Sequence, residues 1–274
     1  MSEIDALWAF LVAGVVSVTL TPLAARIARR VGAVDVPKER SSHERATPFM
    51  GGLAILAGVL VAGLLFMPGG EQTTAILGGA VLITVVGLVD DAVDLSPGVK
   101  LLGQLAAALV LVLADVRVEN VTIPFLGPIH LGAGLGGALT AVGIVAVMNI
   151  VNFTDGMDGL AAGVCTIGAA TFAIIALSLD RVDAGILAAL TAGAAVGFLW
   201  HNFHPASIFM GDAGANLLGF LLAAVAIQGV LKTAAVIAVV FPLVILAVPI
   251  LDFSFVVLKR LKYRRPVYSA DRWH

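Results

Sequence analysis

The chain alternates long apolar runs with short polar connections. Runs of about 20 predominantly apolar residues are long enough to cross the hydrocarbon core of a bilayer as helices. This pattern predicts an all-α polytopic membrane protein with about nine transmembrane helices in a single domain over residues 1–274. The predicted spans are 6–26, 50–67, 73–89, 98–114, 132–151, 159–178, 184–200, 213–230 and 233–258.

One connection departs from this pattern. Polar and apolar residues alternate over 116–131, and a Gly-Pro pair interrupts them. Alternation with a period of two around a turn signal is typical of two paired strands. We therefore expect a small β-hairpin in this connection.

Glycine is frequent inside the predicted spans. Gly159/Gly163 and Gly193/Gly197 have the small-xxx-small spacing that lets membrane helices approach closely. The chain contains 30 glycines, however, and this abundance is enough to explain any single pair.

Composition narrows the class of protein further. Of 274 residues, 60% are hydrophobic and 12% are charged, whereas soluble domains carry about 25% charged residues. The mean hydropathy is +1.05. These values exclude a soluble globule and a disordered chain. Cys165 is the only cysteine, which excludes an intrachain disulfide. The net charge of −2 gives no basis for binding nucleic acid.

The basic residues predict the orientation in the membrane. No Lys or Arg precedes the first span, whereas Arg26, Arg29 and Arg30 follow it. This places the N-terminus outside and the first connection in the cytoplasm. With nine spans, 13 of the 16 basic residues fall on the cytoplasmic side and three fall outside. We therefore expect the hairpin on the outer face and the connections that follow the first, third, fifth and seventh spans in the cytoplasm.

Two adjacent acids end the third predicted span. Asp90 and Asp91 directly follow the apolar residues 83–89. An ionised Asp near the hydrocarbon core costs roughly 2.5–3.5 kcal/mol, and less towards the interface. Neighbouring carboxylates also raise each other's pKa. A divalent cation or a nearby lysine relieves both costs. Taken alone, the segment can also be interpreted as a solvated acidic loop.

The third cytoplasmic connection combines acids with amides. Asn149, Asn152, Asp155 and Asp158 fall within ten residues. Asp155 and Asp158 are three residues apart and share a face if a helix begins there. Carboxylate and amide oxygens are hard ligands suited to Mg²⁺. N-capping by Asp155 is the simpler alternative, but it accounts for only one of the four side chains.

The fourth cytoplasmic connection places Asp212 just before another predicted span. A helix start offers free N–H groups and a positive dipole end, which favour phosphate. Acids for Mg²⁺, helix ends for phosphate and basic residues on one membrane face are the components of phosphoryl transfer. Walker-type and kinase Gly-rich motifs are missing from the sequence. His43, His201 and His204 are each more often structural than catalytic, and the sequence has no zinc motif.

Five motifs, in order along nearly the whole chain, resemble one known family. They are Asp35-x-Pro37 with Arg40 and His43, Pro48-x-x-Gly51-Gly52, Asp90-Asp91-x-x-Asp94, Asn149-x-x-Asn152-x-x-Asp155-Gly-x-Asp158-Gly-Leu, and Phe209-Met-Gly-Asp212-x-Gly214. Together they resemble the polyprenyl-phosphate N-acetylhexosamine-1-phosphate transferases. The first and fourth motifs are more similar to the bacterial undecaprenyl-phosphate GlcNAc-1-phosphate branch than to the phospho-MurNAc-pentapeptide translocases.

The resemblance implies a reaction and its setting. Such enzymes transfer an N-acetylhexosamine-1-phosphate, foremost GlcNAc-1-phosphate, from a UDP-sugar to undecaprenyl phosphate and release UMP. They use Mg²⁺ or Mn²⁺. We therefore expect an enzyme of the bacterial inner membrane with a cytoplasmic active site, whose product is the lipid-linked first sugar of a cell-envelope glycan. Relatives of this kind also suggest a homodimer.

The same resemblance implies roles for individual residues. Asp90 and Asp91 are the expected catalytic acids, as a base towards the lipid phosphate or as a nucleophile. The expected metal ligands are Asp212 and Asn152. The residues expected to bind phosphate are Lys100, Arg40, His43 and His274. The residues expected to bind the nucleotide-sugar are Asn149, Asp155, Asp158, Asn202, Phe209 and Asp94.

The chain departs from the family pattern at two places. Ala215 stands where the family has Ser. The tail Asp271-Arg272-Trp273-His274 stops inside a His-x-His-His motif, from which we expect a chain truncated at its C-terminus.

Two other classes of protein are open alternatives. A CDP-alcohol-type phosphotransferase shares Asp155-Gly156, but it requires an Arg and a later Asp pair that are missing from this sequence. A transporter also buries acids, although near the membrane midplane rather than at the ends of spans.

Overall fold

Helices form most of the protein. The computed structural model describes residues 2–35, 46–123, 127–231 and 247–263. The elements are α1 (Glu3–Val31), β1 (Val34–Asp35), β2 (Thr47–Pro48), α2 (Gly52–Phe66), α3 (Glu71–Val93), α4 (Pro97–Leu113), β3 (Asn120–Ile123), β4 (Gly127–His130), α5 (Gly132–Thr154), α6 (Leu160–Ser178), α7 (Val182–Asn202), α8 (Gly211–Ala226), the π-helix η1 (Ile227–Leu231) and α10 (Ala247–Lys262).

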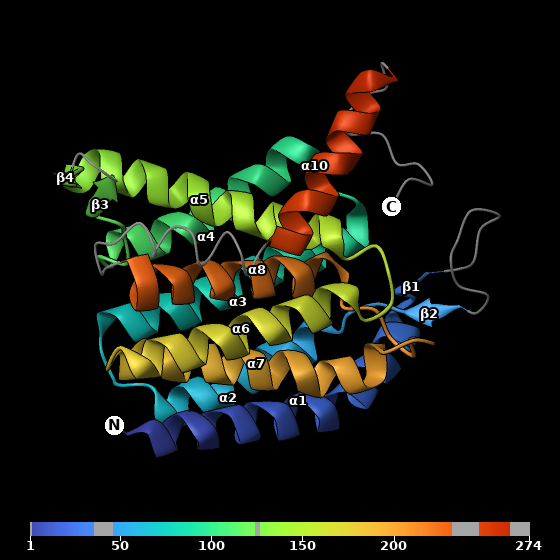
Figure 1. Ribbon diagram of the computed structural model, residues 1–274. Coiled ribbons are helices and arrows are strands. Elements are labelled where there is room, and N and C mark those ends of the chain that lie inside the picture. Colours follow the sequence, from blue (N-terminus) through green and yellow to red (C-terminus); the bar gives the residue numbers. More distant parts are fainter. Residues whose placement is uncertain (1, 36–45, 124–126, 232–246, 264–274) are drawn as a thin grey trace.

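The helices from α1 to α8 run alongside one another, and successive helices alternate in direction (Figure 1). Two small antiparallel sheets, β1–β2 and β3–β4, lie at opposite ends of this bundle. The strands β3 and β4 fall in the connection where the sequence predicts a hairpin. The chain begins at the β3–β4 end. The ends of α3, α5 and α7 and the beginnings of α4 and α8 therefore meet at the β1–β2 end.

Several helices satisfy the requirements for crossing a membrane. Among the described residues, six helices are long and apolar enough, namely α1, α3, α5, α6, α7 and the segment Gly211–Gly229, whereas α2 and α4 are shorter apolar helices. The prediction of a multi-pass membrane protein is confirmed. Of the first eight predicted spans, six coincide with the long apolar helices, and two, 50–67 and 98–114, coincide with the shorter helices α2 and α4. The ninth, 233–258, lies partly outside the described residues, and its described part belongs to α10.

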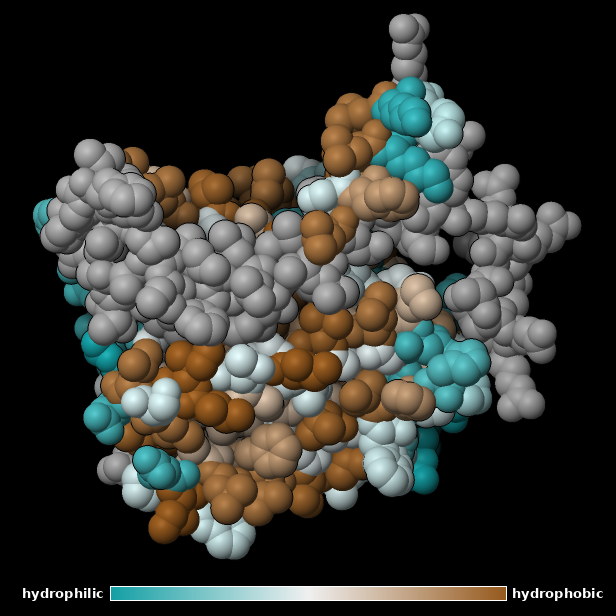
Figure 2. Space-filling model, viewed as in Figure 1, coloured by the Kyte–Doolittle hydropathy of each residue, from teal (hydrophilic) through white to brown (hydrophobic). Residues whose placement is uncertain are grey.

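The surface has the distribution that a bilayer requires. Figure 2 shows apolar residues across the middle of the helices and hydrophilic residues at both ends. On α1, large side chains such as Leu7, Trp8 and Val15 are exposed, whereas Ala6, Ala9 and Ala13 are buried. The large apolar side chains of α1 therefore face lipid, and its small ones face the neighbouring helices.

The helices α1 and α7 approach each other through glycine. A Cβ atom on Gly193 would lie 2.1 Å from the carbonyl oxygen of Phe10, and one on Gly197 would lie 2.4 Å from that of Gly14. Glycine abundance is therefore the wrong explanation for the Gly193/Gly197 pair, because both residues are needed for this contact. At Gly163, by contrast, a Cβ would meet nothing within 4 Å.

Candidate active site

The turn between α3 and α4 brings an acid and a lysine together. Asp90 lies in the last turn of α3, and its Oδ1 accepts a hydrogen bond from the Leu95 N–H at 2.9 Å. Pro97 then begins α4, a position that suits its fixed φ. One turn later, Lys100 Nζ lies 2.8 Å from Asp90 Oδ2. The lysine thus relieves the cost of an acid that is only 8% exposed at the end of an apolar helix.

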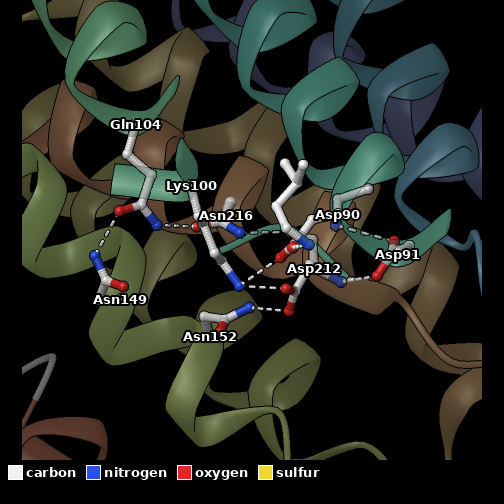
Figure 3. Close-up of polar contacts among 10 residues, drawn as sticks. Asp90, Asp91, Lys100, Gln104, Asn149, Asn152, Asp212 and Asn216 are labelled. Carbon is white, nitrogen blue, oxygen red and sulfur yellow. Dashed lines mark hydrogen bonds and ion pairs between the residues drawn. The ribbon is translucent and has the colours of Figure 1, made fainter. Parts of the chain in front are cut away.

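Lys100 also contacts a second acid, Asp212, in the first turn of α8. Its Nζ is paired with Asp212 Oδ2, while Asn152 Nδ2 donates a hydrogen bond to Asp212 Oδ1 at 2.5 Å. Figure 3 shows Lys100 between the two carboxylates and Asn152 reaching Asp212 from α5. We refer to Asp90, Lys100, Asn152 and Asp212 as the acid–lysine cluster. It joins the ends of four helices, α3, α4, α5 and α8.

Asp91 points to a different partner from Asp90. Its two carboxylate oxygens accept the backbone N–H groups of Asp212 at 2.8 Å and Ala213 at 3.3 Å. These N–H groups belong to the first turn of α8, which a carboxylate stabilises by hydrogen bonding and through the helix dipole. Gly211 leaves space for this contact, because a Cβ there would lie 2.5 Å from Asp91 Oδ2. Gly211 also has a φ of +71°, which favours glycine.

The segment before α8 lies along β2. The Phe209 N–H donates to the Pro48 carbonyl at 2.9 Å, and the Gly51 N–H donates to the Phe209 carbonyl at 3.0 Å. A Cβ on Gly52 would lie 2.4 Å from the backbone nitrogen of Gly214. The Pro48-x-x-Gly51-Gly52 motif therefore brings the beginning of α2 against the beginning of α8 and fixes the position of Phe209.

A cavity of ≈ 520 Å³ opens beside the acid–lysine cluster. Several residues that the sequence predicted for the site line it, namely Asp91, Asn152, Asp155, Asp158, Asn202, Phe209 and Asp212. Asp35 from β1 and Phe49 also line the cavity. Asp35 belongs to the first sequence motif, although no role in the site was predicted for it.

The cavity is acidic. Asp91, Asp155, Asp158 and Asp212 all contribute to its lining. Asp155 follows the last residue of α5, outside the membrane-spanning segment. Burial, together with the nearby negative charges of Asp212, Asp91 and Asp158, raises the pKa of the Asp155 carboxyl well above its ordinary value. The ionised carboxylates in such a cavity repel one another, and the cavity therefore attracts cations.

Two polar side chains tie the α5–α6 connection to the α7–α8 connection. Asn202 Oδ1 accepts the Gly159 N–H at 3.1 Å, and its Nδ2 donates to the Ile208 carbonyl at 3.0 Å. Asp158 Oδ2 accepts the Ala206 N–H at 3.0 Å and lies 2.9 Å from His204 Nδ1. Both side chains line the cavity while shaping its wall. Their direct contact with a nucleotide-sugar stays a prediction.

Other residues predicted for the site lie elsewhere. Asn149 is one turn before Asn152 and donates to Gln104 Oε1 at 2.7 Å, away from the cavity. Asp94 is exposed and caps the end of α3 in the left-handed conformation, with φ +54°. Arg40, His43 and His274 lie outside the described residues.

Gln104 and Asn216 were not among the residues predicted for the site. Gln104 Nε2 donates to Asn216 Oδ1 at 2.7 Å, in the buried region behind the acid–lysine cluster. A signal was available, because each is a carboxamide within an apolar span, four residues after Lys100 and Asp212 respectively. The contact between them, which joins α4 to α8, depends on the packing of helices that are distant in the sequence.

The donor set of the cavity fits a hard divalent cation. Asp212, Asp91 and Asp155 supply carboxylate oxygens, and Asn152 supplies an amide oxygen, which are the ligands that Mg²⁺ prefers. Across the described ranges, no group of three or more His, Cys, Asp or Glu side chains is already gathered for a metal. Lys100 and Asn152 instead engage the two carboxylate oxygens of Asp212.

Fold and site together define a multi-pass membrane protein with an acidic cavity and an adjoining lysine at one end of its helices. Residues 73–230 match the model of glycosyl transferase family 4. The chain belongs to this family, and the resemblance seen in its motifs is confirmed.

Relatives extend the match to nearly the whole chain. A probable undecaprenyl-phosphate N-acetylglucosaminyl 1-phosphate transferase of Bacillus subtilis is 39% identical over 268 residues, covering 97% of this chain and 75% of the relative. A decaprenyl-phosphate N-acetylglucosaminephosphotransferase of Mycobacterium leprae is 35% identical, covering 96% and 74%. A phospho-N-acetylmuramoyl-pentapeptide-transferase of Desulforudis audaxviator is 37% identical, covering 80% and 73%. These relatives are all named as transferases of phosphorylated sugars.

Proposed function

We propose that the protein transfers GlcNAc-1-phosphate from UDP-GlcNAc to undecaprenyl phosphate in the bacterial plasma membrane. The observation that carries this proposal is the acid–lysine cluster, which sits beside an acidic cavity where four helices end. The names of the relatives from Bacillus subtilis and Mycobacterium leprae support GlcNAc-1-phosphate and a polyprenyl phosphate as the two reactants. Membership of glycosyl transferase family 4 favours this reaction over a CDP-alcohol phosphotransferase or a transporter.

The proposed chemistry is a single displacement at phosphorus. An oxygen of the lipid phosphate forms a bond to the sugar-bearing phosphorus of UDP-GlcNAc, and the bond from that phosphorus to the bridging oxygen breaks. The electron pair leaves with UMP, and the product is undecaprenyl-diphosphate-GlcNAc. Such a reaction depends chiefly on positioning and on stabilising negative charge. Lys100, which the two acids hold in place, supplies a fixed positive charge for the phosphates.

The proposed roles of the acids follow from their surroundings. Asp90 turns both carboxylate oxygens to protein donors, Leu95 N–H and Lys100 Nζ, so its role is to place the lysine. Asp91 lines the cavity while it caps α8, and it is the acid that faces the lipid phosphate and receives a proton from it. Phe209 offers an aromatic face at the cavity wall for the uracil ring.

Mg²⁺ is the proposed cofactor, with Mn²⁺ as a substitute. Asp212 and Asn152 are its proposed protein ligands, helped by the remaining cavity acids. When bound, the cation neutralises charge on the diphosphate and on the departing UMP. The protein's own contribution is to hold Lys100 and Asp212 at a fixed separation and to bring the two substrates to one cavity.

The proposed orientation puts the cavity on the cytoplasmic face. With nine spans and the N-terminus outside, 13 of the 16 basic residues fall on the cytoplasmic side, as membrane proteins prefer. The N-terminus and the β3–β4 strands lie at the same end of the bundle, opposite the cavity, which agrees with an outer hairpin and a cytoplasmic site (Figure 1).

Activity is tested with purified protein in lipid nanodiscs. UDP-GlcNAc, undecaprenyl phosphate and Mg²⁺ should give equal amounts of UMP and lipid-linked GlcNAc, and chelation of the metal should stop both. Asp212→Asn and Lys100→Met should each lower kcat by at least about 100-fold, because each removes a charge from the cluster. Asp180→Asn, at an exposed position between α6 and α7, is the matched control and should retain full activity.

The sugar is tested by substitution of the donor. UDP-GalNAc and UDP-MurNAc-pentapeptide replace UDP-GlcNAc in parallel reactions. UMP release with UDP-MurNAc-pentapeptide alone would assign the protein to the reaction named for the Desulforudis audaxviator relative. No UMP with any of the three donors would overturn the proposed function.

A further inference from the structure

Three carboxamides link the helices of the site behind the acid–lysine cluster, and two of them, Gln104 and Asn216, are buried. Asn149 Nδ2 donates to Gln104 Oε1 at 2.7 Å, and Gln104 Nε2 donates to Asn216 Oδ1 at 2.7 Å. Asn216 Nδ2 donates to the backbone carbonyl of Asp212 at 2.8 Å. Figure 3 shows these residues leading from α5 through α4 to α8. We refer to Asn149, Gln104 and Asn216 as the carboxamide chain.

The carboxamide chain repeats the acid–lysine cluster one helical turn away. Residues three or four apart lie on the same face of a helix. The corresponding pairs are Lys100/Gln104 on α4, Asp212/Asn216 on α8 and Asn152/Asn149 on α5. In each pair the carboxamide lies further from the helix end that carries the site. The chain is therefore a second polar layer that joins the same three helices, one turn deeper in the bundle.

Its hydrogen bonds have one direction. The carbonyl of Asp212 can only accept, so Asn216 must present its NH₂ group there and its oxygen to Gln104. Gln104 must then present its oxygen to Asn149, whose NH₂ group also reaches the Val145 carbonyl at 2.8 Å. Gln104 is 1% exposed and uses both ends of its amide, one towards each neighbouring helix. Only a side chain with a donor and an acceptor completes this arrangement.

We propose that the carboxamide chain positions the Lys100–Asp212 pair, with Gln104 as its central positioning residue. The chain ends on the backbone of Asp212, and Gln104 lies one turn from Lys100. It thereby fixes α4 and α8 at the separation that lets these two side chains meet. The effect on phosphoryl transfer rests on the proposed function, whereas the effect on the placement of Lys100 does not.

The protein also contains a hydrogen bond between carboxamides of two helices that lies far from the site, and this bond provides a matched control. Gln228 Nε2 in η1 donates to Gln72 Oε1 in α3 at 3.3 Å. Gln228 follows Asp212 by sixteen residues, about 24 Å along the helix axis. Gln228→Leu therefore removes an amide contact of the same chemistry at the opposite end of the bundle.

The first test compares Gln104→Leu with Gln228→Leu in the whole protein. Gln104→Leu should lower kcat for UMP release by about 10- to 100-fold, while KM for UDP-GlcNAc changes by less than about threefold. Gln228→Leu should leave both constants unchanged. Gln104→Leu should also lower the midpoint of thermal unfolding, because it leaves the buried Asn216 oxygen without its donor. A Gln104→Leu variant with normal kcat would overturn the proposal.

The second test follows Lys100 without substrates. An amine-reactive ester labels the protein, and peptide mass spectrometry compares Lys100 with the exposed Lys262. Gln104→Leu should raise the labelling rate of Lys100 several-fold, because the released lysine loses its carboxylate partners. The labelling rate of Lys262 should not change. Gln228→Leu should leave the labelling rates of both lysines unchanged. If the parent protein releases no UMP, the proposed function fails while this measurement still decides the positioning role. Equal labelling of Lys100 in parent and variant would contradict it.

The double variant Gln104→Leu/Asn216→Leu separates positioning from packing. Removing both partners of the Gln104–Asn216 hydrogen bond leaves neither of these groups unsatisfied, and Asn149 keeps its hydrogen bond to the Val145 carbonyl. We expect the unfolding midpoint to recover towards the parent while kcat stays low. Recovery of kcat together with stability would show that the two residues only fill space, and it would overturn the positioning role.

Discussion

At the scale of single residues, Asp90 and Asp91 show how neighbours in sequence take separate tasks. On a helix, adjacent side chains point about 100° apart. Asp90 therefore reaches Lys100 on α4, while Asp91 reaches the first turn of α8. Asp90 holds the Lys100 ammonium group in place, and Asp91 caps the beginning of α8 beside the cavity. A solvated acidic loop, the simpler interpretation of this sequence, is wrong because Asp90 is buried and both acids have protein partners.

Asp155 gives a prediction about pH. Its pKa is raised in the folded protein, chiefly by burial, so the folded state holds this proton more tightly than the unfolded state does. The corresponding stability is present below the ordinary Asp pKa of about 4 and is lost as the pH rises through the raised value. Asp155→Asn should therefore unfold at a higher temperature than the parent at neutral pH in the presence of EDTA.

The comparison is made by thermal unfolding across a pH series. The advantage of Asp155→Asn should shrink as the pH falls, because the parent carboxyl becomes protonated as well. Mg²⁺ should also shrink it at neutral pH by compensating the charge of the cavity. A difference that is the same at every pH would show that Asp155 acts through packing and not through its charge.

At the scale of elements, the approach of α3 to α8 depends on glycine. A Cβ on Gly87 would lie 2.4 Å from the Cα of Ala213, a backbone atom that has no room to give way. Gly78 lies in the same helix α3, and a Cβ there would meet nothing within 4 Å. The two residues are both glycines of α3, but only Gly87 is packed closely against another helix.

We predict opposite effects for the two alanine variants. Gly87→Ala should destabilise the protein by about 1–3 kcal/mol through overpacking, and it should also lower kcat because the beginning of α8 carries Asp212. Gly78→Ala should be neutral or stabilising by up to about 1 kcal/mol, since alanine favours the helix. Thermal unfolding and UMP release measure the two effects. Equal stability of both variants would contradict the close approach at Gly87.

The sequence predicted the elements better than their contacts. Long apolar runs identified the helices, because hydrophobic length is a local property. The acids and amides at their ends were recognised for the same reason. The Gln104–Asn216 contact was missed, because it joins residues 112 apart in the chain. The role of Gly193 and Gly197 was misjudged, since only the position of α1 shows which glycines face a neighbouring backbone.

At the scale of the whole molecule, orientation decides which compartment supplies the nucleotide-sugar. The helix α3 has 23 residues and a length of about 35 Å, enough to cross a hydrocarbon core of about 30 Å. Glu71 begins it, and Ser96 lies just beyond its other end, beside Lys100. Both residues are exposed, and the only natural cysteine, Cys165, is buried in α6. Single cysteines at these two positions can therefore report on the two faces.

We expect Glu71→Cys to react with a membrane-impermeant maleimide in intact cells, and Ser96→Cys to react only after permeabilisation. The parent chain, with Cys165 alone, should remain unlabelled and sets the background. The reverse pattern would put the cavity on the outer face of the membrane. UDP-GlcNAc would not reach it there, and the proposed reaction would be contradicted. Labelling of both positions from one side would show that α3 does not span the membrane. The expected pattern places Lys100, Asp212 and the cavity on the face where nucleotide-sugars are made.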